Sequence, residues 1–342
     1  MNPSSPGKSR RRERLDRGIK VRSDTVYAIS SWREMTYLVA PRLLLIAGLL
    51  LMPLLLAAVP YWQRVLSIIC IYALLAMSFD FLAHYVGLVS LGGALYIGVG
   101  AYISALLNSE LGLPVYLSIP AATVAGALLC TVLLYPCLPL RGVYFAIVSL
   151  MFPLLAGRIV EALDIFGGTD GIIGLDGFAS HWWEQYLLIA GVLVFLFALR
   201  RLVNEDVGLV FRGLKDNDQA VKASGINITT YKALGVFIAS LMGCFGGACL
   251  AHIYMWAGIS QFALDFSIIP IAATVVGGGG TLVGPVLGCM ILVPISELLR
   301  DFGTLRIAVY AVILTGFIVF KSEGLMVYGT RKYEQFERWV EI

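Results

Sequence analysis

The sequence has little charge for its length. Only 14% of its 342 residues are Asp, Glu, Lys or Arg, whereas a soluble globular domain averages about 25%. Hydrophobic residues make up 59% of the chain, and the charges are concentrated in a few segments with apolar runs between them. These runs approach the roughly 20 residues that a helix needs to cross a bilayer core of about 30 Å. The composition therefore excludes an ordinary soluble domain and indicates a membrane protein.

The apolar runs also lack the alternation of polar and apolar residues that strands of a membrane barrel show. Because lipid cannot satisfy backbone N–H and C=O groups, helices are the remaining solution. We therefore expect an all-α, polytopic membrane protein with about ten transmembrane helices, near 43–59, 65–83, 88–107, 115–135, 142–160, 185–199, 231–253, 266–283, 286–299 and 306–320. The run 266–299 could also hold a re-entrant element in place of two full spans.

Residues typical of enzyme and metal sites are scarce. The three histidines, His84, His181 and His252, are far apart in the sequence, and no HExxH pattern or carboxylate at ligand spacing accompanies them. None of the six cysteines forms a CxxC pair, so buried free thiols are expected. The sequence predicts no catalytic residues, no metal site and no cofactor, which argues against an enzyme.

The few charges are distributed asymmetrically. Segment 1–42 holds ten Lys or Arg against four Asp or Glu, and loop 200–232 holds six against four, whereas 161–184 holds five acids and no Lys or Arg. Because Lys and Arg mark the cytoplasmic side, we expect a basic cytoplasmic N-terminal arm at 1–42, a transmembrane domain at 43–320, and a cytoplasmic tail at 321–342. Beside a membrane domain, the basic arm indicates a topology signal and not nucleic-acid binding.

Two glycine-rich stretches interrupt the third and eighth expected spans. Split as five plus five, the spans place these stretches at the same position in two inverted halves, which is the pattern of a substrate site near the membrane midplane. The alternative is that the glycines only allow close helix packing. The candidate pathway residues in and beside these stretches are Asp80, Gly87, Ser90, Gly92, Gly93, Tyr96, Gly278, Gly279, Gly280 and Thr281.

Within the loop 200–230, residues 213–226 predict a short helix. Asp216 and Asp218 favour its N-terminal turn, Lys222 its end, and Gly225 its left-handed stop. Small side chains on this helix suit close docking of a partner, although an amphipathic helix lying on the membrane would satisfy the same pattern.

Four stretches resemble a known family, the inner-membrane permease subunits of branched-chain amino-acid ABC importers. They are found in the family's order and span roughly residues 65–320: 87–93 with 97–102, 140–148 with 167–172, 219–227 with Tyr231 and Lys232, and 277–282 with Gly284, Pro285, Gly288 and 297–300. The chain departs from the usual family pattern by having Asp80, His84, Leu88 and Gly93 where Asn, Gly, Gln and His are commoner.

The resemblance implies a multi-pass protein of the bacterial cytoplasmic (inner) membrane, with its N-terminus inside. Its implied partners are a second permease subunit, two cytoplasmic ATPases and an extracytoplasmic solute-binding protein. The residues that would couple to the ATPases are Asp216, Asp218, Gln219, Ala220 and Gly225. The implied substrate is a branched-chain or related amino acid; urea, short amides or small carboxylates are alternatives. A self-sufficient channel or secondary transporter is disfavoured by the docking-like helix.

Overall fold

The computed structural model describes residues 46–140, 142–299, 312, 315–317 and 324–329. The basic arm 1–42, most of the tail 321–342 and most of the expected span 306–320 lie outside these described residues. Within them the fold is all-α apart from one pair of two-residue strands, β1 (Ile172–Ile173) and β2 (Trp256–Ala257), which pair antiparallel.

The described helices follow the expected spans closely. Six are long and apolar enough to cross a membrane, and three shorter apolar helices accompany them. The all-α, polytopic expectation is confirmed, whereas the count of ten is not established. The elements are a helix at Ile46–Leu55, α3 (Pro60–Phe81), the π-helix η1 (Leu82–Val86), α4 (Gly93–Ser109), α5 (Val115–Leu134), η2 (Tyr135–Cys137), α6 (Val143–Leu163), α7 (His181–Asn204), α8 (Asp206–Ala223), α9 (Ile228–Tyr254), η3 (Ile259–Phe262), α10 (Asp265–Gly277) and α11 (Gly284–Leu298).

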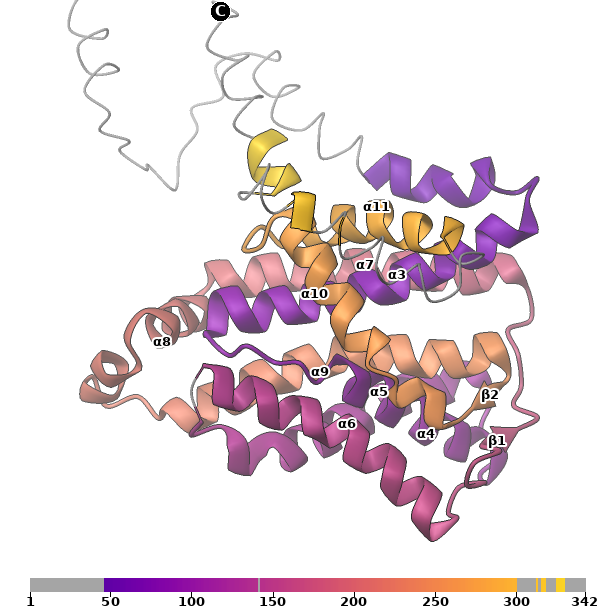
Figure 1. The fold of residues 1–342 in the computed structure, drawn as a ribbon, viewed down its shortest axis with the longest axis horizontal. Coiled ribbons are helices and arrows are strands. Elements are labelled where there is room, and N and C mark those ends of the chain that lie inside the picture. Colours follow the sequence, from indigo (N-terminus) through magenta and orange to yellow (C-terminus); the bar gives the residue numbers. More distant parts are fainter. Residues whose placement is uncertain (1–45, 141, 300–311, 313–314, 318–323, 330–342) are drawn as a thin grey trace, which may run out of the picture. The chain divides into compact units, whose positions relative to one another are not determined.

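Helices α3 and α9 form the centre of the bundle (Figure 1). In their most apolar windows 83% and 67% of the residues are buried, against 33% in α6 and 28% in α7. Apolar helices with so few buried residues must face lipid or another chain, because exposing such apolar surface to water is unfavourable. The central pair is joined by the Ser78 hydroxyl, which donates to the Ala239 carbonyl oxygen at 3.0 Å.

The two halves of the chain exchange packing partners. Helix α3 packs against α10 and α11, whereas α9 packs against α4 and α5. In addition, α4 packs against α5, and α10 packs against α11. This reciprocal arrangement, seen for α3, α4, α5, α9, α10 and α11, is the contact pattern that the expected inverted repeat of five plus five spans would produce.

The two charged loops contact opposite ends of α9. Asp218 in α8 lies 3.7 Å from Lys232 near the start of α9, and the Asp176 carbonyl oxygen lies 2.7 Å from Nδ1 of His252 near its end. A helix of 27 residues is about 40 Å long, which is enough to cross a bilayer. We call these the α8 end and the β1–β2 end of the bundle.

Both glycine stretches are non-helical, and this shortens the helices beside them. Residues 87–92 are not helical, so α4 begins at Gly93 and not at residue 88. Likewise α10 ends at Gly277 and α11 starts at Gly284. With 13 and 15 residues, α10 and α11 are each about 20 Å long, shorter than the bilayer core. They form a tight hairpin in which a side chain at Gly288 would clash with the Ala273 carbonyl oxygen.

Candidate functional site

The first helix break connects η1 to α4. Gly87 ends η1 with a left-handed φ of 80°, a conformation that favours glycine. Inside the break, Leu91 N–H donates to the Ser149 hydroxyl at 2.9 Å, and Gly92 N–H donates to the Ser90 hydroxyl at 3.3 Å. Side-chain hydroxyls therefore satisfy backbone groups that a continuous helix would have satisfied internally.

The start of α4 meets the start of α10. Ala94 N–H donates to the Ser267 hydroxyl at 3.0 Å, so a residue of α10 satisfies one of the free donors at the α4 N-terminus. A Cβ atom at Gly93 would lie only 2.6 Å from the Phe266 carbonyl oxygen. Glycine is therefore required for this approach, and we call it the α4–α10 joint.

A narrow recess opens beside the α4–α10 joint. Its volume of about 10 Å³ is about the minimum that a cavity needs to hold one water molecule. Of the residues that the sequence predicted, Ser90, Gly93 and Tyr96 line it. The other lining residues, which sequence reasoning missed, come from α3, the start of η1 and α10: Leu75, Ser78, Phe79, Leu82, Phe266, Ser267, Pro270 and Ile271. Ser267 could have been noticed as a lone hydroxyl at the start of an apolar run.

Toward the β1–β2 end, aromatic side chains cover the joint. Phe262 of η3 stacks on Tyr102 of α4 with ring centroids 5.6 Å apart. A side chain at Gly98 would clash with the Phe262 ring, so glycine again lets the segment before α10 lie on α4. Phe262 and Tyr102 are 6% and 5% exposed, and they close this side of the joint.

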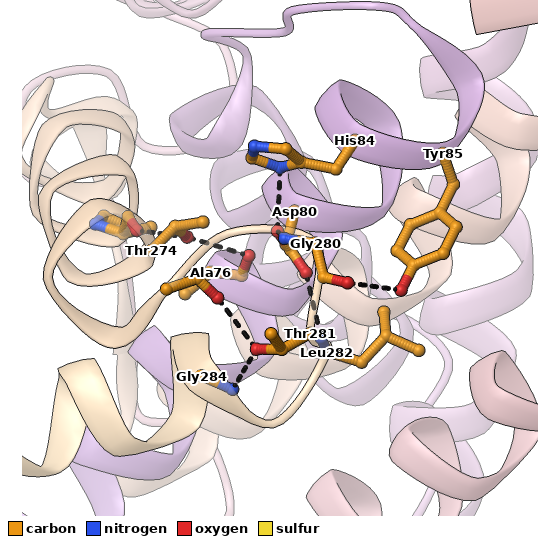
Figure 2. Close-up of polar contacts among 11 residues, drawn as sticks. Ala76, Asp80, His84, Tyr85, Thr274, Gly280, Thr281, Leu282 and Gly284 are labelled. Atoms are coloured by element: carbon orange, nitrogen blue, oxygen red, sulfur yellow. Dashed lines mark hydrogen bonds and ion pairs between the residues drawn. The ribbon is translucent and has the colours of Figure 1, made fainter. Parts of the chain in front are cut away.

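The second helix break, residues 278–283, is held by Asp80 (Figure 2). The Asp80 side chain is completely buried. One carboxylate oxygen accepts a hydrogen bond from Gly280 N–H at 2.6 Å and the other from Leu282 N–H at 3.1 Å. Buried charges are retained where such hydrogen bonds compensate their desolvation.

The turn that Asp80 holds is conformationally strained. Leu282 has a φ of 58°, in the left-handed region that costs a residue with a side chain roughly 1–2 kcal/mol. Gly278 and Gly280 also have positive φ, at 105° and 78°. The Thr281 hydroxyl donates to the Gly278 carbonyl oxygen at 2.8 Å and accepts from Gly284 N–H at 2.9 Å. Thr281 therefore closes the turn and satisfies the first N–H of α11.

Two residues of η1 complete this second site (Figure 2). The Tyr85 hydroxyl donates to the Gly280 carbonyl oxygen at 2.8 Å. His84 Nδ1 lies 2.8 Å from an Asp80 carboxylate oxygen but without the alignment of a hydrogen bond. The His84 ring also packs on Gly279, where any side chain would clash with it.

The structure thus divides the predicted pathway residues into separate places. Ser90, Gly92, Gly93 and Tyr96 lie at the joint and recess. Asp80 is instead hydrogen-bonded to Gly280 in the turn at the other end of α10, which also contains Gly278, Gly279 and Thr281. Gly87 belongs to neither group. A Cβ atom there would lie 2.8 Å from the Cα of Lys215 in α8, so Gly87 allows a backbone contact between η1 and α8.

Helix α8 differs in detail from the predicted 213–226 helix. It begins at Asp206 and is interrupted at Asn217, whose φ and ψ are −158° and 98°. The Asn217 side-chain oxygen accepts from Gln219 N–H at 3.1 Å and Ala220 N–H at 3.2 Å, so it caps a short second segment. Asp216 therefore lies before the cap, and only Asp218 lies in the first turn of that segment. Gly225 follows the helix with a φ of 81°, which confirms the predicted left-handed stop.

The second segment of α8 presents an exposed surface of small and polar residues. Gln219, Ala220, Lys222 and Ala223 are all exposed. The first segment, in contrast, is anchored by Phe211 and Leu214, which are 0% and 5% exposed. The helix is therefore fixed to the bundle by one part and available for contact through the other.

Comparison with known proteins gives a consistent result. Residues 61–321 match the family described as "Branched-chain amino acid transport system / permease component". The chain is similar to the high-affinity branched-chain amino acid transport system permease proteins LivM of Salmonella typhimurium and Escherichia coli. It is 27% identical to each over 291 residues, which cover 75% of this chain and 68% of the relative. No solved structure matches the chain significantly.

The Asp80 contacts predict a large effect of removing this carboxylate. Asp80→Ala leaves the Gly280 and Leu282 N–H groups without their acceptor, and each lost hydrogen bond to a buried charge is worth roughly 1.5–3 kcal/mol. We expect a lower melting temperature in detergent and faster amide exchange at both residues. Asp170→Ala, at an exposed position, is the matched control and should change neither. Unchanged exchange in Asp80→Ala would show that the turn does not depend on this carboxylate.

Proposed function

The chain belongs to the family of branched-chain amino acid transport system permease components, and from this premise we propose how it transports its substrate. We propose that it is a permease subunit of an ABC importer in the bacterial cytoplasmic membrane, and that a branched-chain or related amino acid crosses at the α4–α10 joint. The observation that carries this proposal is the meeting of α4, which begins directly after the first helix break, with the start of α10 at a recess lined by hydroxyls and apolar side chains. Interrupted helices at membrane depth are typical of transporter substrate sites.

The recess in its described state is closed to an amino acid. Its volume of about 10 Å³ accommodates no more than one water molecule. Passage of substrate therefore requires α4 and α10 to separate at the joint. That movement breaks the contact between Ala94 N–H and the Ser267 hydroxyl, and it moves Phe262 away from Tyr102.

Separation of the helices supplies groups that suit an amino-acid zwitterion. The Ala94 N–H at the positive end of α4 becomes available to a carboxylate. The Ser90, Tyr96 and Ser267 hydroxyls can take further hydrogen bonds, while apolar side chains in the same recess, among them Leu75, Phe266 and Ile271, suit a branched aliphatic chain. Urea or a short amide has no such chain to bury and is the alternative substrate class.

We further propose that α8 is the docking element for cytoplasmic ATPases. Its second segment is exposed, small and polar, and its first segment is anchored to the bundle by the buried Phe211 and Leu214. The Lys and Arg excess of loop 200–232 favours the cytoplasmic side for the α8 end. A second permease subunit and an extracytoplasmic solute-binding protein would complete the importer, the latter at the β1–β2 end.

The orientation is tested by labelling single cysteines in intact cells. Thr169 and Lys222 are exposed in the loops at the two ends of the bundle. A cysteine at position 169 should react with an impermeant thiol reagent added outside, whereas one at 222 should react only after the cells are opened. The reverse pattern would place α8 outside, where no ATPase could reach it.

The docking role is tested with two glycines in the same conformation. Gly225 and Gly112 both have positive φ, at 81° and 61°, and a Cβ atom at either would meet nothing within 4 Å. Valine at either position introduces a similar local strain, roughly 1–2 kcal/mol. We expect Gly225→Val to abolish co-purification of the ATPases and to lower the rate of ATP-driven uptake at least tenfold. Gly112→Val should retain both. Equal behaviour of the two variants would remove α8 as the docking element.

The path is tested at the joint with two neighbouring glycines. A methyl group at Gly93 would lie 2.6 Å from a backbone oxygen of α10, whereas one at Gly92 has no contact shorter than 3.4 Å. In proteoliposomes that contain the complete importer, we expect Gly93→Ala to reduce leucine uptake about tenfold and Gly92→Ala to leave it near normal. Protein level and melting temperature are measured in parallel. Uptake lost only in proportion to stability would favour helix packing as the role of Gly93, and normal uptake would exclude the joint as the path.

A further inference from the structure

We infer that Asp80 and Tyr85 are positioning residues that transmit movement of α8 to the α4–α10 joint through the 278–283 turn. The inference rests on the proposed function, because it assigns to α8 the force that the ATPases supply. It concerns residues that touch neither the recess nor the exposed part of α8.

The first step of the connection joins α8 to the end of α3 and to η1. The fully buried Phe211 of α8 packs edge-on against Phe81, with ring centroids 5.5 Å apart. Phe81 in turn stacks on Tyr85 of η1 at 6.4 Å. At Gly87, directly after η1, the backbone approaches Lys215 of α8 so closely that a Cβ atom would be 2.8 Å from its Cα. A displacement of α8 therefore acts on η1 through direct contact.

The second step joins η1 and the end of α3 to the turn. Tyr85 donates to the carbonyl oxygen of Gly280, and Asp80 accepts from its N–H group (Figure 2). Both polar backbone groups of Gly280 are thus held by side chains that are five residues apart, on α3 and η1. A π-helix such as η1 is rare and is frequently found at functional sites, and here it turns the Tyr85 side chain toward Gly280.

The third step runs along α10. The turn begins directly after α10, and the other end of α10 carries Phe266 and Ser267 at the joint. A helix of 13 residues transmits a displacement over about 20 Å. The Thr274 hydroxyl also donates to the Ala76 carbonyl oxygen at 3.2 Å, which joins the middle of α10 to α3. The turn therefore controls where α10 lies against α4.

Removal of the Tyr85 hydroxyl tests whether Tyr85 transmits movement to the turn or only stabilises the fold. Tyr85→Phe keeps the ring and its stacking on Phe81 but removes the hydrogen bond to Gly280. In the reconstituted importer we expect the ATPases to bind and hydrolyse ATP as in the wild type, while substrate imported per ATP falls about fivefold. Tyr144→Phe, at a position 73% exposed on α6, is the matched control and should retain the wild-type ratio.

A second measurement follows the turn directly in the wild-type complex. Amide exchange at Gly280 and Leu282 should differ between the nucleotide-free and nucleotide-bound states, and this difference should be smaller in Tyr85→Phe. An unchanged import-to-hydrolysis ratio in Tyr85→Phe, or exchange that ignores nucleotide in the wild type, would overturn the inference. Failure of the wild-type chain to bind ATPases at all would instead refute the proposed function.

Discussion

The structure depends on one constraint: inside a bilayer, every backbone polar group needs a partner within the protein. Continuous helices meet it by themselves, but this chain interrupts two helical regions. At the first break the Ser90, Ser149 and Ser267 hydroxyls accept from backbone N–H groups. At the second break, the Asp80 carboxylate accepts hydrogen bonds from two backbone N–H groups. Each break is therefore bound to a neighbouring element, and each can move only if that element moves or releases it.

Glycine allows these partners to come close enough. The missing side chain leaves room for the Phe266 carbonyl oxygen at Gly93, for the Phe262 ring at Gly98 and for the His84 ring at Gly279. The same residues that make helices pack closely thus shape the proposed path, so the two interpretations of the glycine stretches are not exclusive. What distinguishes them is function: a packing glycine affects stability and transport together, whereas a path glycine affects transport alone.

Sequence reasoning was most successful where a local pattern determines a local structure. The span 115–135 corresponds to α5, and Gly225 forms the left-handed stop that its position predicted. It was less successful at Asn217, because an Asn within a polar stretch looks the same whether it caps a helix or lies on its surface. It also did not identify the partners of Asp80, because these are backbone groups some 200 residues away that no local pattern indicates.

The sequence alone determined that the chain is a helical membrane protein, where most spans lie and which residues interrupt them, because hydrophobic length and glycine content act locally. Only the tertiary structure decided that the two glycine stretches lie at opposite ends of α10 and serve different partners. It also decided that Asp80 holds a turn and that Gly87 touches α8. These facts depend on α3 packing against helices of the other half of the chain, and such pairings arise from the complementary shapes of surfaces far apart in the sequence.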